Sequence, residues 1–199
     1  MQNPQSRDRL IRTTGDRPPP RSPGPASRNP HRPPVNATSP DPAAGFQRRL
    51  AAVEVRLRDL SRRRLDGRTN PDPATGMRWD AGQIWAHLAD FIPYWISQAE
   101  RVLAADSPDP VLFGRARASA DHIAAIERDR HQGPNALWHD VKEDLNDLRA
   151  FLSDISDRAW QTKGVHPTRG VMTVSQLIEE LLIGHLEHHA TQLEGLRAG

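Results

Sequence analysis

The segment LLIGHLEHHATQL, from Leu181 to Leu193, places His185 and His189 four residues apart within a run of apolar positions. In a helix, successive residues are rotated by about 100°, so residues three and four apart share a face. The face that carries both histidines, with His188 at its edge, also carries apolar residues; these are Ile178, Leu181, Leu182, Leu193 and Leu196. The segment therefore predicts a core-facing helix with two imidazoles in its apolar stripe.

Two interpretations of this histidine pair are open. A buried polar group without a partner costs roughly 1–3 kcal/mol, so both rings need partners. They could be core histidines bonded to nearby carbonyls or carboxylates. Because side chains at i and i+4 point the same way, one metal ion could instead take a nitrogen from each ring. A third candidate ligand elsewhere in the chain favours the metal site.

That third candidate is His87, in the segment WDAGQIWAHLADF from Trp79 to Phe91. This segment begins a second apolar stripe at helical spacing, formed by Ile84, Leu88, Phe91, Ile92, Trp95, Ala99 and Val102. His87 lies on the flank of the stripe. Taken alone, it is typical of a half-buried structural histidine.

Together, the W-x-H-L-x-D helix, the long gap and the closing H-x-x-x-H-x-x-Q helix resemble the DinB/YfiT-like family of metal-dependent enzymes. That family is related to the metal-binding domain of mycothiol-dependent maleylpyruvate isomerase. The resemblance extends from about Phe46 to the C-terminus. It implies that His87, His185 and His189 are metal ligands, that Gln192 is a cofactor-binding residue, and that a low-molecular-weight thiol serves as cosubstrate.

Residues 1–44 differ in composition from the rest of the chain. They hold eleven of the eighteen prolines, seven arginines, three aspartates and almost no large apolar side chain. Such a segment buries too little apolar surface to offset its chain entropy, so we expect a disordered tail followed by one domain, residues 45–199. The tail carries a formal charge of +4, and the formal net charge of the chain is +2. Weak contact with nucleic acid through this tail is therefore an alternative to a solvated extension.

Four amphipathic segments dominate residues 45–199: 46–64, 80–104, 135–155 and a last helix from Thr173, with a weaker helical stretch at 119–130. Asp80 and Thr173 are expected N-cap residues, and Gln176 completes a capping box with Thr173. Residues 162–170 read as a loop, and no stretch alternates with period two, so strands are not expected. The predicted fold class is all-α, a four-helix bundle.

The chain has no cysteine, which excludes disulfides and thiolate ligands. It shows no signal-peptide pattern and no apolar run long enough to span a membrane, so a cytoplasmic protein without membrane contact is expected. The remaining histidines His122, His139 and His166 lie on other predicted elements and read as surface or loop residues. The five tryptophans are interpreted as core or capping residues, and one or two of them could line a pocket.

Three neutral imidazoles leave a divalent ion with its full charge and an open coordination position, which suits catalysis better than a structural role. Zinc, nickel, iron and copper all accept such ligands. The function predicted is a metal-dependent thiol transferase, isomerase or hydrolase acting on a small electrophile. The alternative is a non-catalytic stress-response or binding bundle, in which the histidines are vestigial or hold a structural ion. A homodimer is compatible with either function, and the catalytic residues are unknown.

Overall fold

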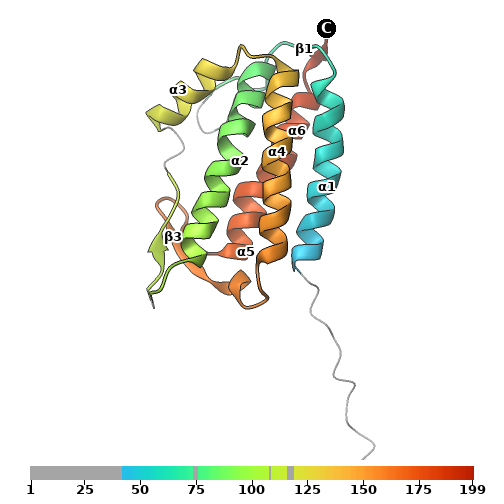
Figure 1. The fold of residues 1–199 in the computed structure, drawn as a ribbon. Helices are drawn as coiled ribbons and strands as arrows, with labels where there is room; N and C mark the ends of the chain where they lie inside the picture. The colour runs from blue at the N-terminus through green and yellow to red at the C-terminus, as the bar shows by residue number, and fades with distance from the viewer. Residues whose placement is uncertain (1–41, 74–75, 108, 116–118) are drawn as a thin grey trace, which may run out of the picture. The chain divides into compact units, whose positions relative to one another are not determined.

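The computed structural model describes residues 42–73, 76–107, 109–115 and 119–199. In this part of the chain, four helical segments run side by side (Figure 1). They are α1 (Pro42–Ser61), α2 (Ala81–Leu103), α4 (Pro134–Asp154) and a last segment that combines α5 (Val174–Leu177), η2 (Ile178–Ile183) and α6 (Gly184–Glu194). The shorter α3 (Ala120–Asp129) packs against α2. The predicted bundle of four helices is confirmed.

The predicted tail, residues 1–44, lies outside the described residues except for its last three positions. Those three belong to α1, which begins at Pro42 and so starts before Phe46, where the first helix was expected to begin. Proline is well suited to a first helical turn, because its fixed φ matches the helix and its missing N–H would have no helical partner there.

The helices form where apolar residues repeat at helical spacing. In α1 the stripe of Phe46, Leu50, Val53, Leu57 and Leu60 is buried as predicted. Its counterpart in α4 consists of Leu137, Val141, Leu145, Leu148 and Leu152, and these two helices pack against each other. Removing a leucine side chain from water stabilises the fold by roughly 1.5–3 kcal/mol, so these stripes determine which faces meet. None of the described helices combines the length and apolar character needed to cross a bilayer.

Two capping boxes fix where the helices that carry the histidines begin. The Asp80 carboxylate accepts a hydrogen bond from the backbone N–H of Gln83, whose side chain accepts one from the Asp80 backbone. Thr173 and Gln176 repeat this arrangement before α5. Both N-caps were predicted from the sequence, and both satisfy N–H groups that a helix leaves without internal partners.

The expectation that the fold has no strands is wrong. β3 (Lys163–His166) and β4 (Gly170–Thr173) form an antiparallel hairpin, and β2 (Val111–Leu112) pairs in parallel with β3. β1 (Leu65–Asp66) pairs with β5 (Arg197–Ala198) near the C-terminus. A short 3₁₀ turn, η1 (Ala159–Gln161), precedes the hairpin. Strands of two to four residues are too short to show an alternating pattern, and two of the three pairings join segments far apart in the sequence.

The last helical segment contains a π-helical turn, η2, which a constant helical period does not predict. The π-turn is identified by the backbone N–H of Gly184, which donates a hydrogen bond to the carbonyl of Glu179, five residues earlier. A π-turn inserts about one extra residue and rotates everything that follows. From its last residue onward, Ile183, Leu186, Ala190 and Leu193 are fully buried, and the histidine pair lies beside this face rather than in its middle.

Candidate metal centre

His87 comes from the first half of α2, where the capping box at Asp80 sets the helix start. The side chain is only 5% exposed, so it is more deeply buried than its flank position in the sequence suggested. The rings of Trp79 and Phe91 each lie with their centroid 5.0 Å from its ring. His87 is therefore a core residue of α2 that faces the last helical segment.

His185 and His189 come from α6 and lie one helical turn apart. His189 is buried, while His185 is partly exposed. Phe91 stacks on the His185 ring at 4.1 Å, and the Trp79 ring is nearly parallel to that of His189 at 5.8 Å. These aromatic side chains restrict the orientation of both imidazoles.

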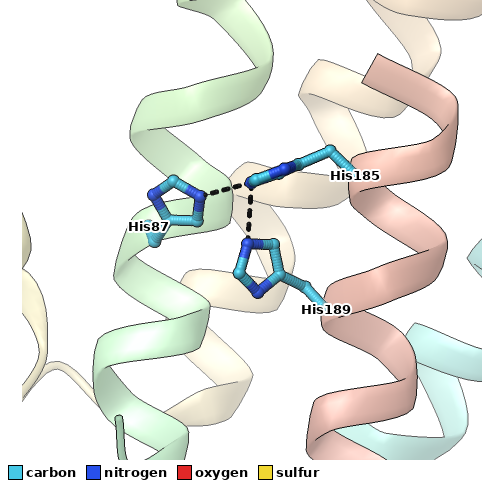
Figure 2. A group of neighbouring side chains, drawn as sticks. All are labelled: His87, His185 and His189. Carbon is cyan, nitrogen blue, oxygen red and sulfur yellow. Dashed lines mark hydrogen bonds between the residues drawn. The ribbon is translucent and has the colours of Figure 1, made fainter. Parts of the chain in front are cut away.

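The three histidines named from the sequence come together in the structure (Figure 2). Nε2 of His185 lies 2.9 Å from Nε2 of His87 and 2.8 Å from Nε2 of His189. One nitrogen from each ring lies within 4.8 Å of the others. Helices α2 and α6 thus direct three nitrogen donors at one point.

Gln192 contacts a histidine of the cluster. Its Oε1 lies 2.7 Å from Nδ1 of His189, three residues earlier on α6. The amide oxygen only accepts, so Nδ1 of His189 carries the proton and Nε2 presents its lone pair. Gln192 therefore fixes the tautomer that a metal ligand at Nε2 requires.

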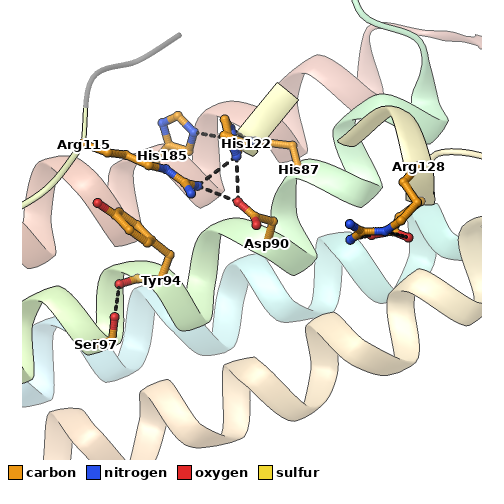
Figure 3. A network of polar contacts seen from close by, with 9 residues as sticks. His87, Asp90, Tyr94, Ser97, Arg115, His122, Arg128 and His185 are labelled. Carbon is orange, nitrogen blue, oxygen red and sulfur yellow. Dashed lines mark hydrogen bonds and ion pairs between the residues drawn. The ribbon is translucent and has the colours of Figure 1, made fainter. Parts of the chain in front are cut away.

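A second group of polar side chains lies behind His87 (Figure 3). Nδ1 of His87 is 3.0 Å from Nε2 of His122, and Nδ1 of His122 is 2.6 Å from a carboxylate oxygen of Asp90. Arg115 donates to the same oxygen at 2.5 Å. His122 was predicted to be an ordinary surface histidine, and that prediction is wrong, because the residue is buried against His87.

His122 could have been recognised from its position relative to Ile126. Residues four apart share a helix face, and His122 and Ile126 are the buried residues of α3. The neighbouring Ile123 is only partly buried. A helix face chosen from Ile123 rather than from Ile126 would place His122 on the outside of this short helix.

His166 is a second histidine that the sequence placed at the surface and the structure buries. It ends β3, and its ring lies against those of Trp95 and Phe113. Its Nδ1 is 3.3 Å from the backbone nitrogen of Thr168. The prediction for His139 is confirmed, since that side chain is 72% exposed.

Burial disfavours protonation of His87 and His122. Burial lowers the pKa of His87 well below its usual 6.5, and the nearby His189, His185, His122 and Arg115 lower it further. Burial also lowers the pKa of His122, and the Arg115 guanidinium adds to this while Asp90 opposes it. Neutral imidazole is the form that binds a metal ion, because the protonated ring has no lone pair to offer.

The histidine cluster borders a cavity of about 410 Å³. Aromatic walls come from Trp79, Phe91 and Trp95, so two of the five tryptophans line the pocket. Charged and polar groups at its border include Arg115, Arg169 and Thr168. A volume of this order suits a small organic ligand, since small-molecule sites typically enclose about 300–1,000 Å³.

The donor set fits a divalent cation. A neutral imidazole carries one N–H, so Nε2 of His185 cannot form a good hydrogen bond with both of its neighbours at once. A cation among the three Nε2 atoms would be bound by all three lone pairs. With metal–nitrogen bonds of about 2.0–2.1 Å, tetrahedral ligands lie roughly 3.3 Å apart, close to the observed 2.8 and 2.9 Å separations.

The sequence matches no protein-family model and no curated protein. Solved structures are similar. YfiT from Bacillus subtilis, described as a probable metal-dependent hydrolase with an unusual four-helix bundle topology, matches with a TM-score of 0.62 at 17% identity. The match covers 81% of this chain and 89% of YfiT.

A mutant of mycothiol-dependent maleylpyruvate isomerase matches with a TM-score of 0.59 at 12% identity, over 78% of this chain. The chain spans 62% of that isomerase, less than two thirds of its length. At these identities the likeness is one of fold. The chain therefore has the fold of the DinB/YfiT-like helical bundles, as its histidine motifs predicted.

Proposed function

We propose that this chain is a metal-dependent enzyme in which His87, His185 and His189 bind one divalent ion. The observation that carries the proposal is the convergence of three Nε2 atoms at the wall of a cavity of about 410 Å³. YfiT, which shares the fold, is described as a probable metal-dependent hydrolase. Three neutral ligands suit zinc, nickel, iron or copper, so the donor set leaves the identity of the ion open.

When bound, such an ion supplies Lewis acidity, which lowers the pKa of a coordinated water or thiol toward neutrality. The chain's own residues shape the rest of the site. Trp79, Phe91 and Trp95 provide apolar contact for a small substrate. Neutral histidines leave the positive charge of the ion uncompensated, which strengthens attraction for an anionic nucleophile.

The reaction we propose is attack by water or a low-molecular-weight thiol on a small electrophile, giving hydrolysis, thiol transfer or isomerisation. The solved relatives support both nucleophiles, because one is described as a hydrolase and the other as a mycothiol-dependent isomerase. The competing function is a binding bundle with a structural ion. The cavity beside the histidines favours the enzyme, since structural metal sites are usually closed by four protein ligands.

Metal content of the untagged full-length protein tests the binding step. We expect about one divalent ion per chain, and we expect His87→Ala, His185→Ala and His189→Ala each to lose most of it. His188→Ala is the matched control, because His188 lies on the same helix and borders the same cavity but is exposed. Equal metal loss from His188→Ala would contradict the choice of ligands.

Turnover tests the catalytic step. The metal-loaded protein is screened for ester and amide hydrolysis and for conjugation of small thiols to electrophiles. We expect turnover that disappears in His185→Ala and persists in His188→Ala. Turnover that survives His185→Ala would remove the ion from the mechanism. A protein that binds the ion and turns over none of these substrates would favour the structural role.

A further inference from the structure

Three side chains from two helices form a continuous line of contacts that ends at His87 (Figure 3). His87 and Asp90 are three residues apart on α2, so they point to the same side. His122 of α3 lies between them, with Nδ1 2.6 Å from the Asp90 carboxylate and Nε2 3.0 Å from Nδ1 of His87. Asp90 and His122 are not among the three proposed metal ligands, so their role needs a separate explanation.

The direction of the hydrogen bonds follows from the chemistry of the first group. An ionised carboxylate only accepts, so His122 donates its Nδ1–H to Asp90. Neutral His122 then has no proton on Nε2, which must accept from His87. His87 therefore carries its proton on Nδ1, and its Nε2 presents a lone pair toward His185, 2.9 Å away.

Arg115 binds the Asp90 carboxylate that accepts from His122. Its Nη2 donates to the same Asp90 oxygen at 2.5 Å, and its guanidinium lies 3.9 Å above the centre of the Tyr94 ring. Nη2 of Arg115 is also 2.8 Å from Nδ1 of His122. These two nitrogen atoms lie close together because both contact the same Asp90 oxygen atom. An arginine held in this way keeps the Asp90 carboxylate in place as the acceptor for His122.

We propose that Asp90 and His122 are positioning residues that hold His87 in the Nδ1–H tautomer, so that its Nε2 is ready to bind the metal ion. The inference deepens the proposed function and rests on the proposed metal site. For His189 the tautomer is fixed by an amide, because the Gln192 side chain accepts a hydrogen bond from Nδ1 of that ring at 2.7 Å. His87 and His189 therefore each have a hydrogen-bond partner at Nδ1.

The tautomer of His87 in the metal-free protein gives the first test of this relay of hydrogen bonds from Asp90 through His122 to His87. Nitrogen-15 NMR of histidine-labelled protein, with His87→Ala used for assignment, reports which ring nitrogen carries the proton. We expect the proton on Nδ1 in the wild type and a mixture of tautomers in His122→Phe. A wild-type His87 with its proton on Nε2 would overturn the proposal. This measurement tests the proposal even if the protein binds no metal ion.

Metal affinity gives the second test, with zinc and a chromophoric chelator in competition. We expect His122→Phe to lose about 10- to 100-fold in affinity, the usual effect of removing a partner of a metal-bound histidine. His122→Gln should recover most of it, because its amide oxygen can accept from His87 as Gln192 does from His189. A structural role alone would not distinguish phenylalanine from glutamine in this way.

His166→Phe is the matched control for affinity. His166 is buried to a similar extent, 5% exposed against 7% for His122, and it borders the same cavity. Its ring packs against Trp95 and Phe113 rather than against a ligand. We expect its affinity within about threefold of the wild type, since it supports no ligand. Equal affinity losses in the two phenylalanine variants, or none in His122→Phe, would overturn the relay.

The two proposals fail in different ways. If the wild type binds zinc through His185 and His122→Phe has the same zinc affinity, the metal site is supported and the relay is contradicted. If the wild type binds no ion but His87 carries its proton on Nδ1 only while His122 is present, the relay stands as a structural feature and the proposed function falls. Melting curves of each variant show whether a loss reflects unfolding.

Discussion

The side-chain oxygen of Gln192 lies 2.7 Å from Nδ1 of His189, one helical turn earlier on α6. The contact lies entirely within α6. The family resemblance implied that Gln192 binds a cofactor, but a glutamine in this position can also orient a metal ligand. Its position behind the imidazole favours the second role, because the amide contacts the nitrogen that faces away from the other two histidines.

Replacing Gln192 should change metal affinity according to what the new side chain can accept. We expect Gln192→Leu to weaken zinc binding by about tenfold, because His189 loses the partner that fixes its tautomer. Gln192→Glu should bind zinc at least as tightly as the wild type, since a carboxylate is a stronger acceptor. Chelator competition measures both, with His188→Ala as the control. Identical affinities in the leucine and glutamate variants would contradict this role.

The stability of the metal-free protein should fall as the pH is lowered below about 6.5. The pKa of His87 and of His122 is lowered in the folded state, so below 6.5 the unfolded chain binds protons that the folded chain does not. Each such histidine lowers the free energy of unfolding by up to about 1.4 kcal/mol per pH unit. The contribution is fully present above the unfolded pKa and is lost as the pH falls toward the folded value.

Chemical denaturation between pH 7.5 and 5.5 measures this dependence. His122→Gln should flatten the curve, whereas His139→Gln should leave it unchanged, because His139 is exposed. A wild-type stability that stays constant or rises as the pH falls would show that the histidines are protonated in the folded protein.

Asp144 on α4 should destabilise the protein at neutral and higher pH. Burial raises the pKa of this half-buried carboxyl from 3.8 to about 7, and the neighbouring Asp147, Asp140 and Glu143 raise it further. Between these two values the folded chain retains a proton that the unfolded chain has lost, so stability falls as the pH rises from about 4 to 7.

Asp144→Asn removes this penalty. We expect it to raise the free energy of unfolding by about 1–2 kcal/mol at pH 8, a value reduced for solvent screening of a half-buried group, and by less at pH 5. Thermal and urea melts at the two pH values measure the difference. Asp157 is an exposed carboxylate that is not among the acidic neighbours of Asp144, so Asp157→Asn should change stability little at either pH. A stabilisation that is the same at pH 5 and pH 8 would contradict the assigned cause.

Gly184 should be required for the geometry of the histidine pair. A Cβ atom at this position would lie 2.8 Å from the carbonyl oxygen of Glu179, which accepts the hydrogen bond that marks the π-turn. We expect Gly184→Ala to destabilise the fold by about 1–3 kcal/mol, the range for overpacking, and to weaken zinc binding as α6 shifts. Denaturation and chelator competition give the two readouts.

Gly45→Ala is the matched control, because Gly45 also lies inside a helix but a Cβ atom there would meet no described atom within 4 Å. Alanine there should stabilise the protein by up to about 1 kcal/mol through its higher helix propensity. If both alanine variants stabilise the fold and leave metal binding intact, the close contact at Gly184 has no structural consequence.

Much of the bundle could be predicted because its determinants are local. Five apolar residues of α1 at 4-3-4-3 spacing and the side-chain caps at Asp80 and Thr173 are visible within one or two helical turns. The i, i+4 spacing of His185 and His189 is equally local. His87 was added by resemblance, because its own position on the flank of α2 gave no sign that it would meet them.

The features that were missed depend on contacts between distant segments. β2 and β3 pair across about fifty residues of intervening chain, and two-residue strands carry no alternating pattern. His122 is buried because α3 packs against α2, and the rotation of a ten-residue helix is weakly determined by its few apolar residues. Asp90 is part of the W-x-H-L-x-D motif, yet its role depends on His122, which only the folded chain brings to it.

The π-turn at 178–183 also bears on how related chains are compared. The spacing between the Thr173 cap and His185 includes one residue that an uninterrupted α-helix would not contain. A chain with the same number of residues but an uninterrupted α-helix here would turn its histidine pair by roughly 100° relative to the cap. A homologue whose interval is one position shorter can instead keep the pair in the same orientation with a regular α-helix, because the π-turn accommodates that one extra residue. The length of this interval therefore predicts whether a related chain needs a π-turn to assemble the three-histidine cluster.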